Sequence, residues 1–500
     1  MDFPLDALQH LLHGLSVALR PDNLFLVFVG CFLGTLVGVL PGIGPVGAIS
    51  ILLPLTFQIE PAGAIILLAG IYYGVMYGGS TTSILVNVPG ETASVITCLD
   101  GYQMARQGRA GPALGIAAFG SFIAGTLGLI GLQIVAGPLS AIALKFGPPE
   151  YLALIVMGFS FITFLSPGSK LKAVIMAFFG LILCSVGLDP ITSQQRMTLG
   201  VLNLFEGIGV APLAMGLFGV SEVFSNLEST TTRRGIDVNM RDLLPTKADW
   251  LQAKWAIARG TLIGFLLGIL PGGGPVIATF IAYGVEKASA RQPERFGKGA
   301  IEGVASVESA NNAAASTSFI PLLTLGIPPN VVLAVLLGAF LIHGVVPGPL
   351  LIKDHPDVFW GLIGSMYIGN VMLLVLNLPL IPLWVQVLRI PDEILYPLIL
   401  LFCVVGAYCI NNSVFDIVVM LISGAAGYLF KKAGYESAPL ILAFVLGPMF
   451  EVNLRRSLLI SRGSFAFFFS RPIALGALVI SAMLVALSLY QSRGRKKRHW

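Results

Sequence analysis

Long apolar runs, separated by short polar connections, follow one another along almost the whole chain. Uninterrupted examples lie at 150–166, 172–187, 394–410 and 471–490. A helix needs about 20 residues to cross the hydrocarbon core of a bilayer, which is about 30 Å thick. By that measure the pattern predicts an all-α polytopic membrane protein with roughly ten to twelve membrane segments. An outer-membrane barrel is excluded because the runs are continuous and do not alternate.

Two glycine- and proline-rich breaks interrupt apolar segments at distant places in the chain. Residues 30–45 read GCFLGTLVGVLPGIGP, and residues 260–275 read GTLIGFLLGILPGGGP. Glycines at four-residue spacing line one face of each predicted helix and let another backbone approach closely. A Pro-Gly pair then ends each helix, and Pro45 and Pro275 suit the first position of a new one. Each restart leaves unpaired N–H groups and the positive end of a helix dipole inside the membrane.

The breaks belong to a longer internal repeat, and loop charges predict that its two copies face opposite ways. The loop 57–61 has no Lys or Arg, whereas the matching loop 287–298 carries Lys287, Arg291, Arg295 and Lys298. Because Lys and Arg favour the cytoplasm, equivalent loops are expected on opposite sides of the membrane. Broken or re-entrant helices at matching places of two inverted-topology repeats indicate a transport site. The alternative is that these motifs only pack two helices tightly.

Polarity and charge divide the chain into five predicted parts. Residues 1–23 have leucines at helical spacing, which predicts an interfacial amphipathic helix or a lead-in helix without a functional role. Membrane repeats are expected at 24–227 and 251–490, with a cytoplasmic linker at 228–250 and a basic cytoplasmic tail at 491–500. The tail does not predict nucleic-acid binding, since no aromatic platform accompanies it. This topology places Arg455, Arg456 and Arg462 outside, against the general trend of the loop charges.

Composition agrees with a membrane protein. The chain is 56% hydrophobic and only 11% charged, against roughly 25% charged residues in soluble domains. Its five cysteines include no CxxC pair, so we interpret them as packing residues.

Two polar stretches provide the candidate chemistry. Residues 77–91 read YGGSTTSILVNVPGE, and residues 308–318 read ESANNAAASTS before a second proline break at 324–330. Hydroxyls and freed carbonyls at a broken helix suit small cations and carboxylates, although Ser and Thr also commonly bond to their own helix. Because the apolar portions of the two motif helices lack Lys and Arg, substrate carboxylates are expected at half-helix N-termini and hydroxyls. The candidate substrate-binding residues are Gly42, Gly44, Ser80, Thr81, Asn87, Gly272, Gly274, Asn311, Ser316 and Thr317.

Coupling to a cation is expected from the membrane potential. A potential of 100 mV, negative inside, opposes each entering negative charge by about 2.3 kcal/mol. Proton coupling needs a titratable group, and the candidates Glu91, Glu302 and Glu308 are expected near water at the edges of the polar stretches. Sodium needs only oxygen ligands, so sodium is favoured over the proton, and no metal site or other cofactor is predicted. The candidate coupling residues are Ser80, Thr82, Asn312 and Ser316, with Glu308 as the carrier in the case of a proton.

Four segments together carry a resemblance to a known family. LPGIGP, YGGSTTSILVNVPGE, LPGGGP and ESANNAAASTSFIPLLTLGIP resemble the large membrane subunit, the TctA family, of the bacterial tripartite tricarboxylate transporters. The resemblance covers nearly the whole chain and implies a cation-coupled secondary importer of citrate or related carboxylates in the bacterial inner membrane. It also implies a small membrane subunit and a periplasmic substrate-binding protein as partners.

Two other classes of function remain open from the residues alone. A membrane-embedded enzyme is less favoured, because the apolar runs offer no pair of aspartates and no HExxH motif, and His343 is a weak candidate for a Ser–His site. A channel or scaffold subunit without its own coupled transport would not require two matched broken helices. The sequence therefore favours a transport subunit that is not an enzyme.

Overall fold

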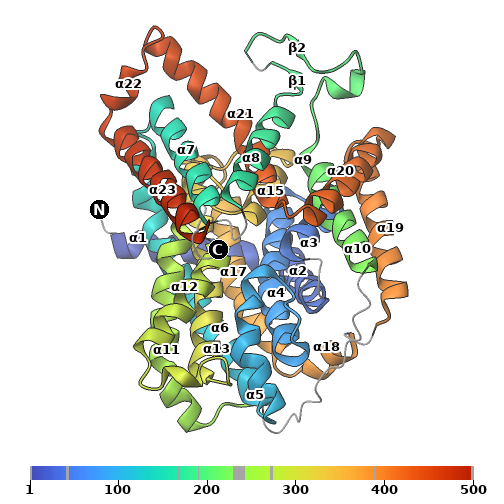
Figure 1. Ribbon diagram of the computed structural model, residues 1–500, viewed down its shortest axis with the longest axis vertical. Coiled ribbons are helices and arrows are strands. Elements are labelled where there is room, and N and C mark those ends of the chain that lie inside the picture. The colour runs from blue at the N-terminus through green and yellow to red at the C-terminus, as the bar shows by residue number, and fades with distance from the viewer. Residues whose placement is uncertain are drawn as a thin grey trace.

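The computed structural model is built almost entirely of helices (Figure 1) and describes residues 3–40, 44–165, 169–189, 191–228, 243–270, 274–387 and 390–496. The first half contains α1 (Phe3–Ala18), α2 (Pro21–Val39), α3 (Gly44–Leu52), η1 (Leu53–Thr56), α4 (Pro61–Val86), η2 (Thr92–Val95), η3 (Cys98–Tyr102), α5 (Gln103–Arg106), α6 (Ala110–Ala143), α7 (Pro148–Leu165), α8 (Lys170–Cys184), β1 (Gly187–Leu188), β2 (Gln195–Arg196), η4 (Leu202–Leu204), α9 (Val210–Ala214), η5 (Met215–Val220) and α10 (Ser221–Leu227).

The second half begins with α11 and ends with the long helix α23. It contains α11 (Lys247–Ile269), α12 (Gly274–Ser289), η7 (Pro293–Arg295), α13 (Ile301–Thr317), α14 (Phe319–Leu325), α15 (Val331–Ile342), α16 (Leu351–Asp354), α17 (Pro356–Asn377), α18 (Ile381–Val387), α19 (Asp392–Asn411), α20 (Val414–Lys432), α21 (Ser437–Ile460), α22 (Ala466–Phe469) and α23 (Pro472–Lys496). Residues 229–242 of the predicted linker and 497–500 of the predicted tail lie outside the described residues.

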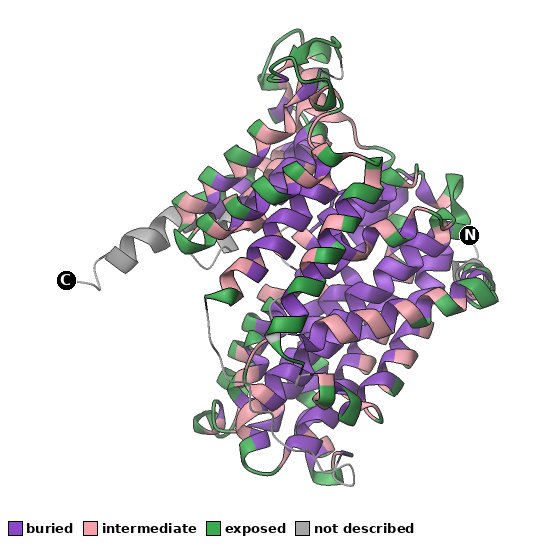
Figure 2. Ribbon diagram, turned by 90° about the vertical axis from the view of Figure 1, so that its right-hand side faces the viewer, coloured by how far each residue is buried: buried purple, intermediate pink, exposed green. Residues whose placement is uncertain are grey.

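Among the described residues, eight helices are long and apolar enough to cross a membrane. They are α2, α4, α6, the continuous stretch Val210–Leu227, α17, α19, α20 and α21. In the apolar window of α4, 94% of the residues are buried, against 28% in α20. Helix α4 is therefore central, and α20 exposes apolar side chains such as Leu421 and Ile422 at the edge, as expected for contact with lipid. Figure 2 places the buried residues in the middle of the helix assembly. The prediction of an all-α polytopic membrane protein is confirmed.

The second glycine–proline break turns the chain back on itself. Arg259, in the middle of α11, forms an ion pair of 2.7 Å with Glu286, near the end of α12. Ser306 of α13 contacts both arms, because it lies against Gly260 and its hydroxyl donates to the carbonyl oxygen of Ala282 at 3.2 Å. Helices α11 and α12 thus form a hairpin whose tip is the break.

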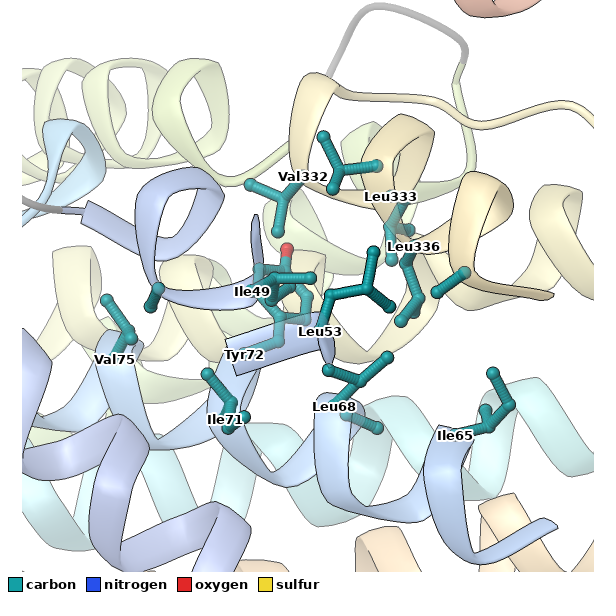
Figure 3. Close-up of a cluster of buried hydrophobic side chains, with 14 of the residues drawn as sticks. Ile49, Leu53, Ile65, Leu68, Ile71, Tyr72, Val75, Val332, Leu333 and Leu336 are labelled. Carbon is teal, nitrogen blue, oxygen red and sulfur yellow. The ribbon is translucent and has the colours of Figure 1, made fainter. Parts of the chain in front are cut away.

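The first break has the same shape. Helix α2 lies along α4. Helix α3, which follows the break, also packs against α4. Figure 3 shows Ile49 and Leu53 of this returning arm over Tyr72 and Leu68 of α4, where α15 joins them in one buried cluster. Both breaks are therefore tips of helical hairpins and not kinks in continuous spans.

Glycines bring α2 against α4, and α11 against α13, to backbone contact. A Cβ atom on Gly34 would lie under 3.0 Å from backbone atoms of Ile71, and one on Gly264 would do the same at Ala310. The same kind of contact occurs one helical turn before and one turn after Gly34 and Gly264. In order, Gly30, Gly34 and Gly38 face Leu67, Ile71 and Val75, while Gly260, Gly264 and Gly268 face Ser306, Ala310 and Ala314.

These contacts align residues 67–91 with residues 306–330 without a gap. Asn87 and Gly326 occupy matching places after the helices and share a left-handed conformation, with φ of 60° and 71°. Glu91 and Asn330 also match, and both have φ of −147° as caps of the next helices. The alignment pairs Tyr77 with Ser316. The hydroxyl clusters at 80–82 and 316–318 are consequently not at equivalent positions of the two halves.

The two equivalent helices α4 and α13 run antiparallel. Tyr73, in the middle of α4, stacks on Phe319, which follows α13, with ring centroids 6.0 Å apart. Ser80, about two turns further along α4, binds Glu308, about three turns before Phe319. Opposite directions of equivalent helices are what an inverted repeat requires. The side of the membrane that each end faces stays a prediction.

Arg455, which the predicted topology places outside, belongs to a cluster of ion pairs. The short antiparallel hairpin of β1 and β2 pairs Gly187 with Arg196. Arg196 and Arg455 both form ion pairs with Asp189 and Glu451. Two acidic groups therefore compensate two arginines at this end of α21. The loop-charge rule counts Lys and Arg and gives acidic residues little weight, so these ion pairs leave Arg455 at odds with the predicted orientation.

The described part of α1 packs against α17. A Cβ on Gly14 would meet the backbone of Trp360, whose ring stacks on His10 with centroids 4.7 Å apart. His13 Nε2 lies 2.8 Å from a carboxylate oxygen of Asp357. Helix α1 is therefore attached to the helix assembly, and its position at the membrane surface stays a prediction.

Thiol labelling tests the predicted orientation. In a chain whose exposed Cys409 is replaced by serine, Gln58→Cys is expected to react with an impermeant thiol reagent in intact cells. Ala290→Cys is expected to react only after the cells are opened, because its loop carries the basic residues that favour the cytoplasm. Labelling of both positions from the same side would contradict the inverted repeat.

Candidate functional site

Polar side chains are buried where α4 crosses α13. Ser80 and Thr81 of α4 are 5% and 3% exposed. Glu308, Asn311 and Asn312 of α13 are at most 1% exposed. Because buried polar groups require hydrogen-bond partners, their contacts define what this cluster can do.

Glu308 is the centre of one group of contacts. Its carboxyl accepts hydrogen bonds from Ser80 Oγ, at 2.6 Å, and from Thr97 Oγ1. The amide of Asn312 donates to Ser121 Oγ at 2.7 Å and to the backbone carbonyl of Glu308 at 3.2 Å. The structure thus brings together Ser80, Asn312 and Glu308, three of the predicted coupling residues, and adds groups from α6 and from the segment before η3.

Glu91 is the centre of a second group. It caps η2 by accepting from the backbone N–H of Ala93 at 2.5 Å, and it accepts from the amide of Asn311 at 3.2 Å. Tyr72 lies beside Glu91 and beside Asn330, the equivalent cap in the second half. The side-chain oxygen of Asn311 has no hydrogen-bond partner among the described residues. Glu91 and Asn330, the capping residues of the two halves, therefore both lie beside Tyr72.

A new helix starts after each of the two breaks. Gly44 and Gly274 begin α3 and α12 with φ of +63° and +66°, a conformation that side chains rarely adopt. No described atom lies within 4 Å of the place that a Gly44 side chain would take, whereas a Cβ on Gly274 would be 3.2 Å from Asn330. Helix α3 of the first half contacts α15 of the second half, and α12 of the second half contacts η2 of the first. Each hairpin therefore touches the other half of the repeat. Gly42 and Gly272 lie outside the described residues.

Other predicted residues make bonds within the helix framework. Thr82 donates to the carbonyl of Val39 at 2.8 Å, and Thr317 donates to the carbonyl of Ala313 at 2.9 Å. Asn87 is exposed at the end of α4. Ser316 is 1% exposed and lies beside Tyr73. The structure therefore does not bring Thr82, Asn87 and Thr317 to the Glu308 group, and their roles in binding stay predictions.

A small polar cavity adjoins the Glu308 group. Its volume of about 10 Å³ is near the lower limit for holding one water molecule. A tricarboxylate is far larger, so binding there would require the helices to move apart. The lining residues are Tyr77, Ser80, Thr81, Leu114, Ala117, Ala118, Ser121 and Asn377.

The expected position of the acidic residues near water is wrong for two of the three. Glu91 is 6% exposed and Glu308 is 0% exposed. Glu302 alone is partly exposed, and it forms an ion pair of 3.4 Å with Arg295. An acidic residue at the end of a polar stretch in the sequence need not lie at the protein surface. Glu308 is buried because α13 is surrounded by α6, α11 and α12. The argument that favoured sodium over the proton loses this premise.

Several residues of the site were not predicted. Tyr72, Thr97, Ser121 and Asn330 contribute contacts that come from separate parts of the chain. One sequence signal was available for Asn330, because Glu91 and Asn330 each follow a proline by two residues at matching places of the repeat. Thr97 and Ser121 had no such signal, since only the packing of α6 and η3 against α13 makes them neighbours of Glu308.

A polytopic helical protein with two matched hairpins around a buried polar cluster has the architecture of secondary transporters. A family model described as the tripartite tricarboxylate transporter TctA family matches residues 24–442, and the chain belongs to this family. The transport class expected from the sequence is thereby confirmed at the level of the family.

Two curated relatives come from Agrobacterium vitis. One is described as an uncharacterized 52.8 kDa protein in the TAR-I ttuC' 3' region, and it is 50% identical over 493 residues, 99% of this chain and 98% of the relative. The other, described as an uncharacterized protein in the TAR-II ttuC' 3' region, is 53% identical over 234 residues, 47% of this chain and 97% of the relative. No solved structure matches the chain.

Proposed function

We propose that this chain is the transport subunit of a tripartite importer that carries tricarboxylates or related carboxylates across the bacterial inner membrane, coupled to the entry of cations. The family supports the class of substrate. The observation that carries the mechanism is the pair of equivalent helix starts at Gly44 and Gly274, of which Gly274 lies against Asn330. A channel would have no need of two matched helix starts.

In this proposal the anion is held without a cationic side chain. Among the described residues, no Lys or Arg is buried. The starts of α3 and α12 present backbone N–H groups and the positive ends of helix dipoles, which stabilise carboxylates. Asn330 adds a side-chain polar group beside the start of α12. Gly44 and Gly274 keep the approach to the backbone free of side chains.

Cations have to accompany the substrate. A negative-inside potential opposes each entering negative charge by about 2.3 kcal/mol per 100 mV. Cations moving inward with the anion offset this cost. Sodium or the proton can serve, and the oxygen-rich surroundings of Glu308 are the proposed place for coupling.

The proposed partners are a small membrane subunit and a periplasmic substrate-binding protein, as in other tripartite transporters. The binding protein delivers the carboxylate to the outer face, and the small subunit covers part of the membrane-facing surface. The carboxylate therefore reaches the hairpin tips at an effective concentration that free substrate does not provide.

Reconstitution tests this function. Proteoliposomes with the chain and both partners are expected to accumulate a radiolabelled carboxylate above its external concentration when a sodium or proton gradient is imposed. The chain alone is expected to transport poorly at micromolar substrate. Equilibration without accumulation under either gradient would favour a channel, and full activity of the single chain would count against the tripartite assembly.

A further inference from the structure

Glu308 is a fully buried carboxyl that has no cationic partner among the described residues. Its side chain is 0% exposed, and its contacts are hydroxyls of Ser80, Thr97 and Ser121. The described titratable groups whose charges reach it are Tyr77, Glu91 and Cys98, none of which is a cation. An uncompensated buried charge is unfavourable. The carboxyl therefore requires a proton or a bound cation in at least part of a working cycle.

The hydroxyl of Ser80 fits both states of this carboxyl. Ser80 Oγ lies 2.6 Å from Oε2 of Glu308 and 3.1 Å from the carbonyl oxygen of Met76. A hydroxyl has one hydrogen to donate and two lone pairs that accept. Ser80 can donate to the carboxylate, or it can turn, donate to Met76 and accept a hydrogen bond from the protonated carboxyl. Neither state leaves the Ser80 hydroxyl or Oε2 without a partner.

A metal cation fits the same surroundings less well. A cation needs several oxygen atoms that point their lone pairs at one place. Around Glu308, however, Ser80 and Thr97 direct their hydrogens at the carboxyl oxygens. The amide N–H₂ group of Asn312 is taken up by Ser121 and by the Glu308 carbonyl. Cation binding would require the hydroxyls of Ser80 and Thr97 to turn, whereas protonation requires only Ser80 to do so.

The small polar cavity gives this carboxyl a route to water. Ser80 and Ser121 line the cavity and also contact Glu308. The cavity has room for about one water molecule, and the side-chain oxygen of Asn377 on its wall has no hydrogen-bond partner among the described residues. A water molecule there would bind Asn377 and reach the hydroxyl that touches the carboxyl.

We propose that Glu308 is the proton-carrying group of transport and that Ser80 is the hydroxyl whose orientation follows its protonation. A proton from water adds to Oε2 in one orientation of the transporter, and the same O–H bond breaks to release it to water on the other side. One proton thus crosses per cycle without any change of redox state. This assignment rests on the proposed function, because a proton carrier has a role only in coupled transport.

Proton-driven uptake by the complete transporter tests the assignment. Proteoliposomes with all three subunits are loaded at alkaline pH, diluted into acidic sodium-free buffer, and assayed with radiolabelled citrate and succinate. Wild type is expected to accumulate at least one of these carboxylates. Glu308→Gln is expected to reduce proton-driven accumulation to the level of empty vesicles, because an amide carries no proton. Glu294→Gln, at an exposed position in η7, is the control that removes a carboxyl outside the buried cluster, and it is expected to accumulate like wild type.

The outcomes separate this assignment from the proposed function. Accumulation by Glu308→Gln equal to that of wild type, or wild-type accumulation that requires a sodium gradient, overturns the role of Glu308. If wild type accumulates neither carboxylate under either gradient, the proposed function itself is contradicted.

Ser80→Ala provides a second readout, which decides the question should Glu308→Gln fail to reach the membrane. Ser80 can bond to both states, but its hydrogen bond to the carboxylate is charge-assisted and therefore the stronger of the two, so Ser80 favours the charged state. Its loss is expected to move the alkaline limb of the pH profile of uptake upward by about one pH unit. A merely structural role of Ser80 predicts a lower rate with an unchanged profile, and that result overturns the proposal.

Discussion

Replacing Gly44 or Gly274 with valine is expected to abolish carboxylate uptake while membrane abundance stays near normal. Both residues begin a hairpin arm at positive φ. A side chain in this conformation costs about 1–2 kcal/mol, which is small beside the packing of the surrounding helices. The isopropyl group would cover the N–H groups at the helix start, where we place the substrate carboxylate. Uptake and immunodetection in membrane fractions measure the two effects separately.

A matched control separates strain from loss of the site. Gly344 has a similar φ of +72°, and no described atom lies within 4 Å of its missing side chain. Gly344→Val therefore carries a comparable backbone strain far from the hairpin tips, and it is expected to retain uptake. Normal transport by both Gly44→Val and Gly274→Val would remove the substrate site from the tips.

Replacing Gly34 or Gly264 with valine is expected to have the opposite signature, a large loss of folded protein in the membrane. A Cβ at either position would lie under 3.0 Å from backbone atoms of the neighbouring helix. Overpacking commonly costs about 1–3 kcal/mol, and here the obstacle is backbone, which cannot change rotamer. The helices α2 and α4, or α11 and α13, would have to separate along their whole contact.

The measurement is the yield of monodisperse protein after mild detergent extraction. Gly476 of α23 serves as the control, because no described atom lies within 4 Å of its missing side chain and Gly476→Val adds the same apolar group to a helix. Its yield is expected to match wild type. Yields of Gly34→Val and Gly264→Val equal to that of the control would show that the glycine contacts are not required for folding.

The apolar runs and the glycine–proline breaks were readable from the sequence because each depends on local chemistry. Continuous apolar residues need helices in a bilayer, and proline with glycine ends a helix wherever it stands. The repeat was also readable, since both copies keep glycines at four-residue spacing before the break. These features determined the class of protein, the position of the hairpin tips and the choice of Gly44 and Gly274.

The depth and neighbours of the polar residues were decided only by tertiary structure. Helices α4 and α13 are buried on every side, so their sequences carry no polar face that would tell which residues meet. Ser80 meets Glu308 because α4 and α13 run antiparallel, and Thr82, two residues away, points instead to α2. The side-chain partners of Glu308, by contrast, come from the other half of the repeat. The sequence alone therefore predicted a site at the breaks, while the crossing of the two halves decided that Glu308 is buried among hydroxyls of the first half.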